Sequence, residues 1–137
     1  MAVLKFENYI VNDISYIKNK DFKDMTKNID LNPILNADFN INKDDIRVKL
    51  NILVGSLDDV KVPFKVECEV TGMFRYDEEE NDTEIPKETI IKNNTVAILY
   101  PYVRQLIASI TQQSNEYPAY ILPTINVAKT LEEQNKN

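Results

Sequence analysis

Apolar and polar residues alternate over three neighbouring segments of the chain, and this alternation limits the fold more than any other feature. The segments are 35–41 (LNADFNI), 46–54 (IRVKLNILV) and 60–70 (VKVPFKVECEV). A repeat of two places every second side chain on one face, as in an antiparallel strand with one face buried and the other in water. Turn-forming residues at 42–45 and 55–59 separate the segments. The sequence therefore predicts consecutive strands joined by hairpins.

A further, weaker strand is predicted over residues 6–17, which are rich in β-forming residues. The link that follows, 18–32, is too long for a hairpin loop and predicts a crossover with a helical turn around 22–27. Pro63 interrupts the last strand and has no N–H to donate to a ladder. Either the N–H side of this residue faces solvent, or the strand bulges there. Gly72 marks a second bend.

The second half of the chain changes to the repeat of a helix. Pro86 suits the first helical position, and 86–93 (PKETIIKN) is a short helix candidate. Asn94 or Thr95 can cap a second, longer helix. Pro101 lies within this longer helix and indicates either a late start close to it or a kink.

The longer helix is apolar on two sides, and a single sheet face can cover only one of them. The first stripe consists of Val96, Leu99, Val103, Leu106 and Ile110, and the second of Ile98, Tyr102 and Ile107. The second stripe needs another partner, which is either a second copy of the chain or the chain's own C-terminal loop and helix. That loop, 117–127, contains two prolines yet is strongly apolar, so we expect it to lie over other parts of the protein.

These elements predict one α+β domain over residues 1–137. A four-stranded antiparallel sheet occupies about 6–76 and the helices about 86–134. The long helix and the C-terminal helix, for which 128–137 is the candidate, pack on one face of the sheet.

Composition excludes several classes of function. The chain has no histidine, one cysteine and two glycines, so it lacks the parts of a Ser-His-Asp or Cys-His nucleophile, a His-ligated metal site or a phosphate-binding loop. Its net charge of −6 disfavours nucleic acid. No signal peptide or membrane span is evident, which predicts a cytoplasmic protein without membrane insertion. We therefore expect no enzyme activity, no cofactor and no metal.

An acidic run, 76–84 (YDEEENDTE), allows three interpretations. It is a solvated loop, a carboxylate metal site or a docking patch for a basic partner. An enzyme that uses Asp77 to Glu80 is the least supported hypothesis, because nothing else in the sequence suggests a reaction.

Residues 94–113 (NTVAILYPYVRQLIASITQQ), followed by 117–127 (YPAYILPTINV), closely resemble the SecB family of export chaperones. Weaker matches lie at 12–16 and 64–74. The residues that match the helix signature are Leu99, Tyr100, Pro101, Tyr102 and Arg104, and those that match the loop are Leu122, Ile125 and Asn126.

The resemblance implies a homotetramer built as a dimer of dimers, with the long helices at the central interface. The interface residues that it implies are Leu99, Tyr102, Val103, Leu106 and Ile110. It also implies a groove for unfolded polypeptide, covered by the loop after the long helix. The peptide-binding residues carried over to it, or added by position and chemistry, are Leu31, Phe64, Tyr117, Tyr120, Leu122, Ile125 and Val127.

Docking of the SecA motor is implied only in part. Asp13 and Glu67 match two of the family's acidic docking residues, whereas Ile17 and Lys65 depart from its pattern. The family's acidic tail is also replaced, by residues 132–137 (EEQNKN). The chain is thus predicted to be an ATP-independent holdase for unfolded preproteins, or alternatively a solitary chaperone that protects the antitoxin of a toxin–antitoxin pair. A hypothesis of another class is a structural or adaptor protein whose apolar surfaces serve self-assembly only.

Overall fold

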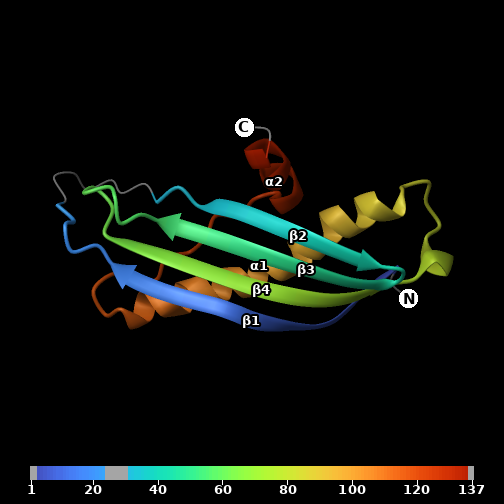
Figure 1. Cartoon of the computed structure of the whole chain (residues 1–137), viewed down its shortest axis with the longest axis horizontal. Helices are drawn as coiled ribbons and strands as arrows, with labels where there is room; N and C mark the ends of the chain where they lie inside the picture. Colours follow the sequence, from blue (N-terminus) through green and yellow to red (C-terminus); the bar gives the residue numbers. More distant parts are fainter. Residues whose placement is uncertain (1–2, 24–30, 136–137) are drawn as a thin grey trace.

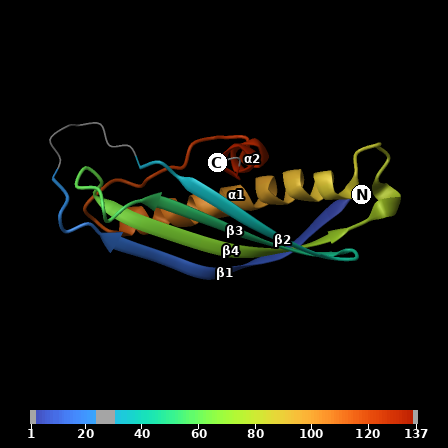
Figure 2. The same ribbon diagram turned by 45° about the horizontal axis from the view of Figure 1, so that its top comes forward.

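The computed structural model describes residues 3–23 and 31–135, and its two layers are a four-stranded sheet and a pair of helices (Figure 1). The strands are β1 (Leu4–Lys18), β2 (Ile34–Asn42), β3 (Asp45–Gly55) and β4 (Phe64–Tyr76). A short 3₁₀ turn, η1 (Glu78–Glu80), precedes the helices α1 (Lys87–Gln113) and α2 (Val127–Asn135). Both helices lie on the same face of the sheet, as the second view also shows (Figure 2). The predicted α+β class is confirmed.

The strands are antiparallel and lie in the order β1-β4-β3-β2. The β2–β3 hairpin turns through Lys43 and Asp44, and Lys43 adopts a positive φ of 56°. The crossover carries the chain from β1 at one edge to β2 at the other. The helical turn expected around 22–27 lies largely outside the described residues.

The predicted start of the last strand is wrong. β4 begins at Phe64, and Pro63 lies immediately before it, so the ring never enters the ladder. Instead the Pro63 carbonyl accepts a hydrogen bond from the N–H of Asn19 at 2.9 Å. Pro63 is thus the last residue of the loop before β4, and its missing N–H does not interrupt strand pairing.

The predicted division of the helical region is also wrong, because α1 runs without a break from Lys87 to Gln113. Pro86 occupies the N-cap position, and the hydroxyl of Thr95 donates to the Ile91 carbonyl at 2.6 Å within the helix. Pro101 lies inside α1, where it removes the N–H that would bond to the carbonyl of Ala97. Ala97 and Pro101 are both exposed, so water can satisfy that carbonyl.

The core forms between α1 and the inner face of the sheet. The apolar helix residues with no exposed surface are Ile91, Val96, Leu99, Val103 and Ile107. They pack on alternate residues of the two central strands, such as Val48, Leu50, Val66 and Val70, which are equally buried. The alternation of the sequence therefore marks the buried face correctly.

α1 lies very close to the sheet at Gly72 in β4. A Cβ added there would lie 2.6 and 2.9 Å from the two δ-carbons of Leu99, which is closer than carbon atoms tolerate. Gly72 is required by this approach of the helix, since its backbone has no special dihedral angle in the structure.

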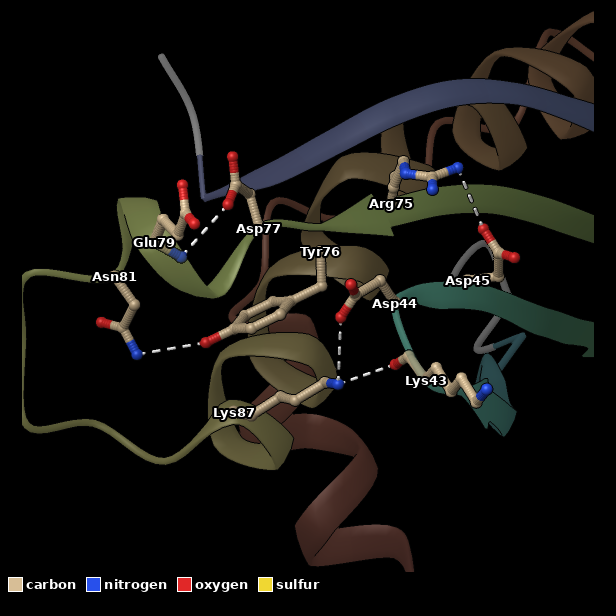
Figure 3. Close-up of polar contacts among 9 residues, drawn as sticks. All are labelled: Lys43, Asp44, Asp45, Arg75, Tyr76, Asp77, Glu79, Asn81 and Lys87. Atoms are coloured by element: carbon tan, nitrogen blue, oxygen red, sulfur yellow. Dashed lines mark hydrogen bonds and ion pairs between the residues drawn. The ribbon is translucent and has the colours of Figure 1, made fainter.

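The start of α1 is held against the β2–β3 turn (Figure 3). Lys87 Nζ donates to the Lys43 carbonyl at 2.7 Å and lies 3.5 Å from the Asp44 carboxylate. The same ammonium group lies 5.1 Å from the centroid of the Tyr76 ring, a cation–π contact. The Tyr76 hydroxyl in turn accepts from Asn81 Nδ2 at 3.1 Å.

The acidic run forms a capped surface turn. The Asp77 carboxylate accepts from the N–H of Glu79 at 3.1 Å and begins η1, whose residues are largely exposed. Within the described ranges, no group of three or more Cys, Asp or Glu side chains is arranged to hold a metal ion. In the same part of the chain, neither helix has a stretch of the length and hydropathy that a membrane span requires.

We predict that Gly72→Ala lowers the free energy of unfolding by about 1–3 kcal/mol, because the added methyl group collides with Leu99. Urea denaturation measures the change. A Cβ at position 72 would also lie 2.8 Å from Phe74 Cε1, so the double variant Gly72→Ala/Leu99→Ala removes only the collision with Leu99. Its cost should still be smaller than the sum of the single costs. Additive costs would contradict the proposed contact.

Candidate functional site

The apolar loop between the helices, 114–126, is fastened along the second half of α1. The N–H of Tyr120 donates to Thr111 Oγ1 at 2.8 Å, while the Thr111 hydroxyl donates to the Ile107 carbonyl at 2.9 Å. Farther along, the hydroxyl of Tyr100 donates to the Pro123 carbonyl at 2.6 Å. Leu122, between these two points, is fully buried. Two hydrogen bonds to the helix and one buried side chain therefore fix the path of the loop.

Four aromatic rings from separate segments form a row beneath the start of this loop, and we call it the aromatic row. Tyr16 of β1 lies 5.2 Å from Phe64 of β4, and Phe64 lies 5.6 Å from Tyr117 of the loop. Tyr117 meets Phe22 of the crossover edge-on at 6.5 Å between centroids. Phe64 is buried, but the other three rings are half-buried. The row thus presents aromatic surface that can receive apolar side chains.

Asn19 fixes the crossover beside the row. Its side-chain amide donates to the carbonyls of Asp59 and Val62 at 2.9 and 2.8 Å, and its Oδ1 accepts from the N–H of Asp21. The side chain is 3% exposed, so these bonds are needed to offset its burial. The sequence gives no signal for this role, because the partners lie about 40 residues away.

The seven predicted peptide-binding residues all belong to the core or pack against it. Phe64, Leu122 and Val127 are buried, and their side chains support the surface from below. The half-buried members are Leu31, Tyr117, Tyr120 and Ile125. The sequence analysis did not assign Tyr16 and Phe22 to the site. Their aromatic side chains were the available signal, but only the fold brings them next to Phe64 and Tyr117.

One flank of α1 remains uncovered beside β1. Tyr102 is 38% exposed, and Leu106 and Ile110 are half-buried, whereas Leu99 and Val103 face the sheet with no exposed surface. The Tyr102 ring lies 4.6 Å from that of Tyr9 and 5.5 Å from that of Phe6, both in β1.

We call the apolar surface of Tyr9, Ile98, Tyr102, Leu106 and Ile110 the α1–β1 face. The chain's own C-terminal helix does not cover it, since α2 lies on the β2 side of the molecule (Figure 1).

The sheet face without helices carries the two predicted docking acids. Asp13 lies opposite Glu69 in the β1–β4 register, and Glu67 is the next residue of β4 on that face. The Glu67 carboxylate accepts from Asn51 Nδ2 at 3.2 Å. Lys65 follows on the same face, opposite Ile17.

Among the titratable groups near these surfaces, Cys68 and Glu116 have shifted pKa values. Burial, together with the charge of Asp13, raises the pKa of the Cys68 thiol to about 11, so the thiol stays protonated on the inner face of β4. Hydrogen bonding to Lys18 at 2.8 Å lowers the pKa of the exposed Glu116 carboxyl. The second contact links the end of β1 to the loop just before Tyr117.

A four-stranded antiparallel sheet, one long helix laid along it and an apolar loop returning over that helix define a SecB-like fold. The family model for the preprotein translocase subunit SecB matches residues 2–137, and the chain therefore belongs to the SecB family. The family predicted from the helix and loop signatures is confirmed.

The chain is 38% identical over 131 residues to the uncharacterized protein MJ0357 of Methanocaldococcus jannaschii, with 93% of this chain and 81% of that protein covered. Its fold is similar to that of the Mycobacterium tuberculosis SecB-like chaperone Rv1957, solved in complex with a ChAD peptide from the Rv1956 HigA1 antitoxin. The TM-score is 0.61 at 15% identity, over 89% of this chain and 90% of that one. A protein of unknown function from Streptococcus agalactiae is also similar, with a TM-score of 0.51 at 15% identity over 88% of this chain and 97% of that one.

Proposed function

We propose that this chain is an ATP-independent holdase that binds non-native polypeptide in an extended form. The observation that carries the proposal is the aromatic row, in which three half-buried rings surround the buried Phe64 at the start of a loop that the helix holds in place. Membership of the SecB family supports the same function. The proposal includes a cytosolic location and no catalytic chemistry.

The mechanism requires only differential exposure of apolar side chains. A folded client has buried the side chains that the row and the loop would receive, while a non-native client exposes them. Binding therefore favours the non-native state by mass action and needs no nucleotide. Tyr117, Tyr120, Ile125 and Leu31 would touch the client, and the buried Phe64, Leu122 and Val127 would support them.

We further propose that the α1–β1 face joins copies of the chain into a dimer of dimers. Several aliphatic and aromatic side chains lie together there, and their burial would contribute several kcal/mol at about 25 cal/mol per Å². Of the five predicted interface residues, we propose that Tyr102, Leu106 and Ile110 form the contact, since Leu99 and Val103 face the sheet with no exposed surface.

The clients and partner of this holdase can belong to either of two systems. In export, Asp13 and Glu67 would dock SecA on the helix-free sheet face, and their diagonal positions on the neighbouring strands β1 and β4 support this role. In a toxin–antitoxin system the client would be the antitoxin. The similarity to a chaperone solved with an antitoxin peptide supports that alternative, as do Ile17 and Lys65 beside the docking acids. A structural or adaptor protein without client binding is the competing class.

Client holding is testable by the aggregation of a chemically unfolded protein, followed by light scattering without nucleotide. The wild type should slow aggregation, and Tyr117→Ser/Ile125→Ser should weaken client binding about tenfold or more by removing apolar contact area. Leu122 is unsuitable because it is buried and holds the loop. Thr124→Ser, an exposed change in the same loop, is the control. Equal aggregation with and without the wild type would refute the holdase, and altered assembly with unchanged client binding would support the adaptor.

Assembly is testable by the molar mass from light scattering on a sizing column. Tyr102→Asp should lower the mass, because it places a charge in the proposed apolar interface. Asn93→Asp, an exposed position on the α2 side of the same helix, should leave the mass unchanged. A monomeric wild type, or a Tyr102→Asp variant of unaltered mass, would contradict the interface.

The export role predicts that Glu67→Lys weakens binding to purified SecA and leaves aggregation suppression intact. The reason is that the change reverses one of the two docking charges without touching the aromatic row. Asp38→Lys, exposed on β2, provides the matched charge reversal away from those acids. If SecA binds neither the wild type nor the variants while clients are held, the antitoxin role is favoured.

A further inference from the structure

The outer edge of β2 begins with a contact that resembles strand pairing. The Leu35 N–H points away from the sheet and donates to Gln134 Oε1 of α2 at 2.9 Å. The same side-chain amide donates from Nε2 to the Pro33 carbonyl at 3.3 Å. One residue of an added strand would satisfy the same two backbone groups, since each strand residue supplies one donor and one acceptor.

The edge continues beyond this contact with open backbone groups. β2 is an edge strand, and the N–H groups of alternate residues point to the same side, so those of Ala37 and Phe39 point outward as Leu35's does. A cleft of about 570 Å³ adjoins this part of the edge. Its apolar lining comes from Ala37 and Phe39 of β2 and from Ala128 and Leu131 of α2.

An extended segment laid on the β2 edge would match both features. Its backbone would pair with the outward groups of β2, and every second side chain would enter the apolar cleft. Lys92 and Glu132 both line the cleft, so it carries charges of both signs and does not select clients by net charge. A cleft of about 570 Å³ accommodates a few side chains of an extended segment, whereas a folded partner would not fit in it.

We infer that the β2 edge is a strand-addition site for client polypeptide and that the Gln134 amide occupies its first position in the free chain. This inference rests on the proposed holdase function and adds a second point of contact to the aromatic row. The loop that covers the row leads directly into α2, so one covering segment borders both sites (Figure 2). Release of Gln134 from the edge frees the Leu35 N–H and the Pro33 carbonyl for the client's backbone.

The test measures the affinity of the full chain for a fluorescein-labelled peptide of about 20 residues rich in valine, tyrosine and serine, by fluorescence anisotropy. Gln134→Ala removes the competing amide and should tighten binding about 3- to 10-fold. Gln134→Glu keeps the size of the side chain and can still accept from the Leu35 N–H, but it cannot donate to the Pro33 carbonyl, so it should tighten binding less than Gln134→Ala does. Gln105→Ala, an exposed change on α1, is the matched control and should have no effect.

Two further measurements separate edge pairing from a change in packing. Ala37→Pro removes an outward N–H at an edge position that tolerates proline, so it should weaken binding and cancel the gain of Gln134→Ala. Hydrogen exchange at the Leu35 amide should become faster in Gln134→Ala and slow again when the peptide binds. Thermal unfolding checks that each variant remains folded.

Unchanged or weaker binding in both Gln134 variants would overturn the strand-addition site, and so would peptide binding that leaves Leu35 exchange unchanged. The holdase proposal would survive either result if the wild type still suppresses aggregation. If the wild type and every variant bind no peptide and suppress no aggregation, both proposals fail.

Discussion

The close approach of α1 to the sheet at Gly72 is the contact on which the rest of the structure depends. With Leu99 lying directly over a residue without a side chain, one helix can cover the inner faces of both central strands. The helix then has two flanks left for other purposes. One flank meets the loop through Tyr100 and Thr111, and the other presents Tyr102 beside β1.

Because the fold has only two layers, much apolar surface remains accessible. Two layers bury one face of the sheet and one stripe of the helix, while the aromatic row, the α1–β1 face and the cleft beside α2 stay partly open. The chain has no histidine, and among the residues that the structure describes no group of three Cys, Asp or Glu side chains is arranged to hold a metal ion. A protein that binds extended polypeptide and its own copies uses such surfaces directly, because recognition of non-native chains needs apolar area and backbone groups more than it needs shape.

Local patterns predicted the fold well, and long-range contacts limited the rest. Period-two alternation identified the strands and their buried faces, and the apolar helix and loop identified the family. The helix boundaries were wrong because Asn94 and Thr95 favour caps locally, whereas packing of Ile91 and Leu99 on the sheet keeps the helix continuous. Asn19 and Gln134 gave no signal, since each acts on backbone groups that only the folded chain brings near.

The strand order β1-β4-β3-β2 also governs how this protein must be made. β1 is the first strand to be synthesised, yet its partner β4 ends at Tyr76, which pairs with Leu4. During translation the first strand therefore waits unpaired until three others have emerged, with its aromatic residues and both backbone edges open to solvent. A family member of this topology passes through the same exposed, aggregation-prone condition from which it is proposed to protect its clients.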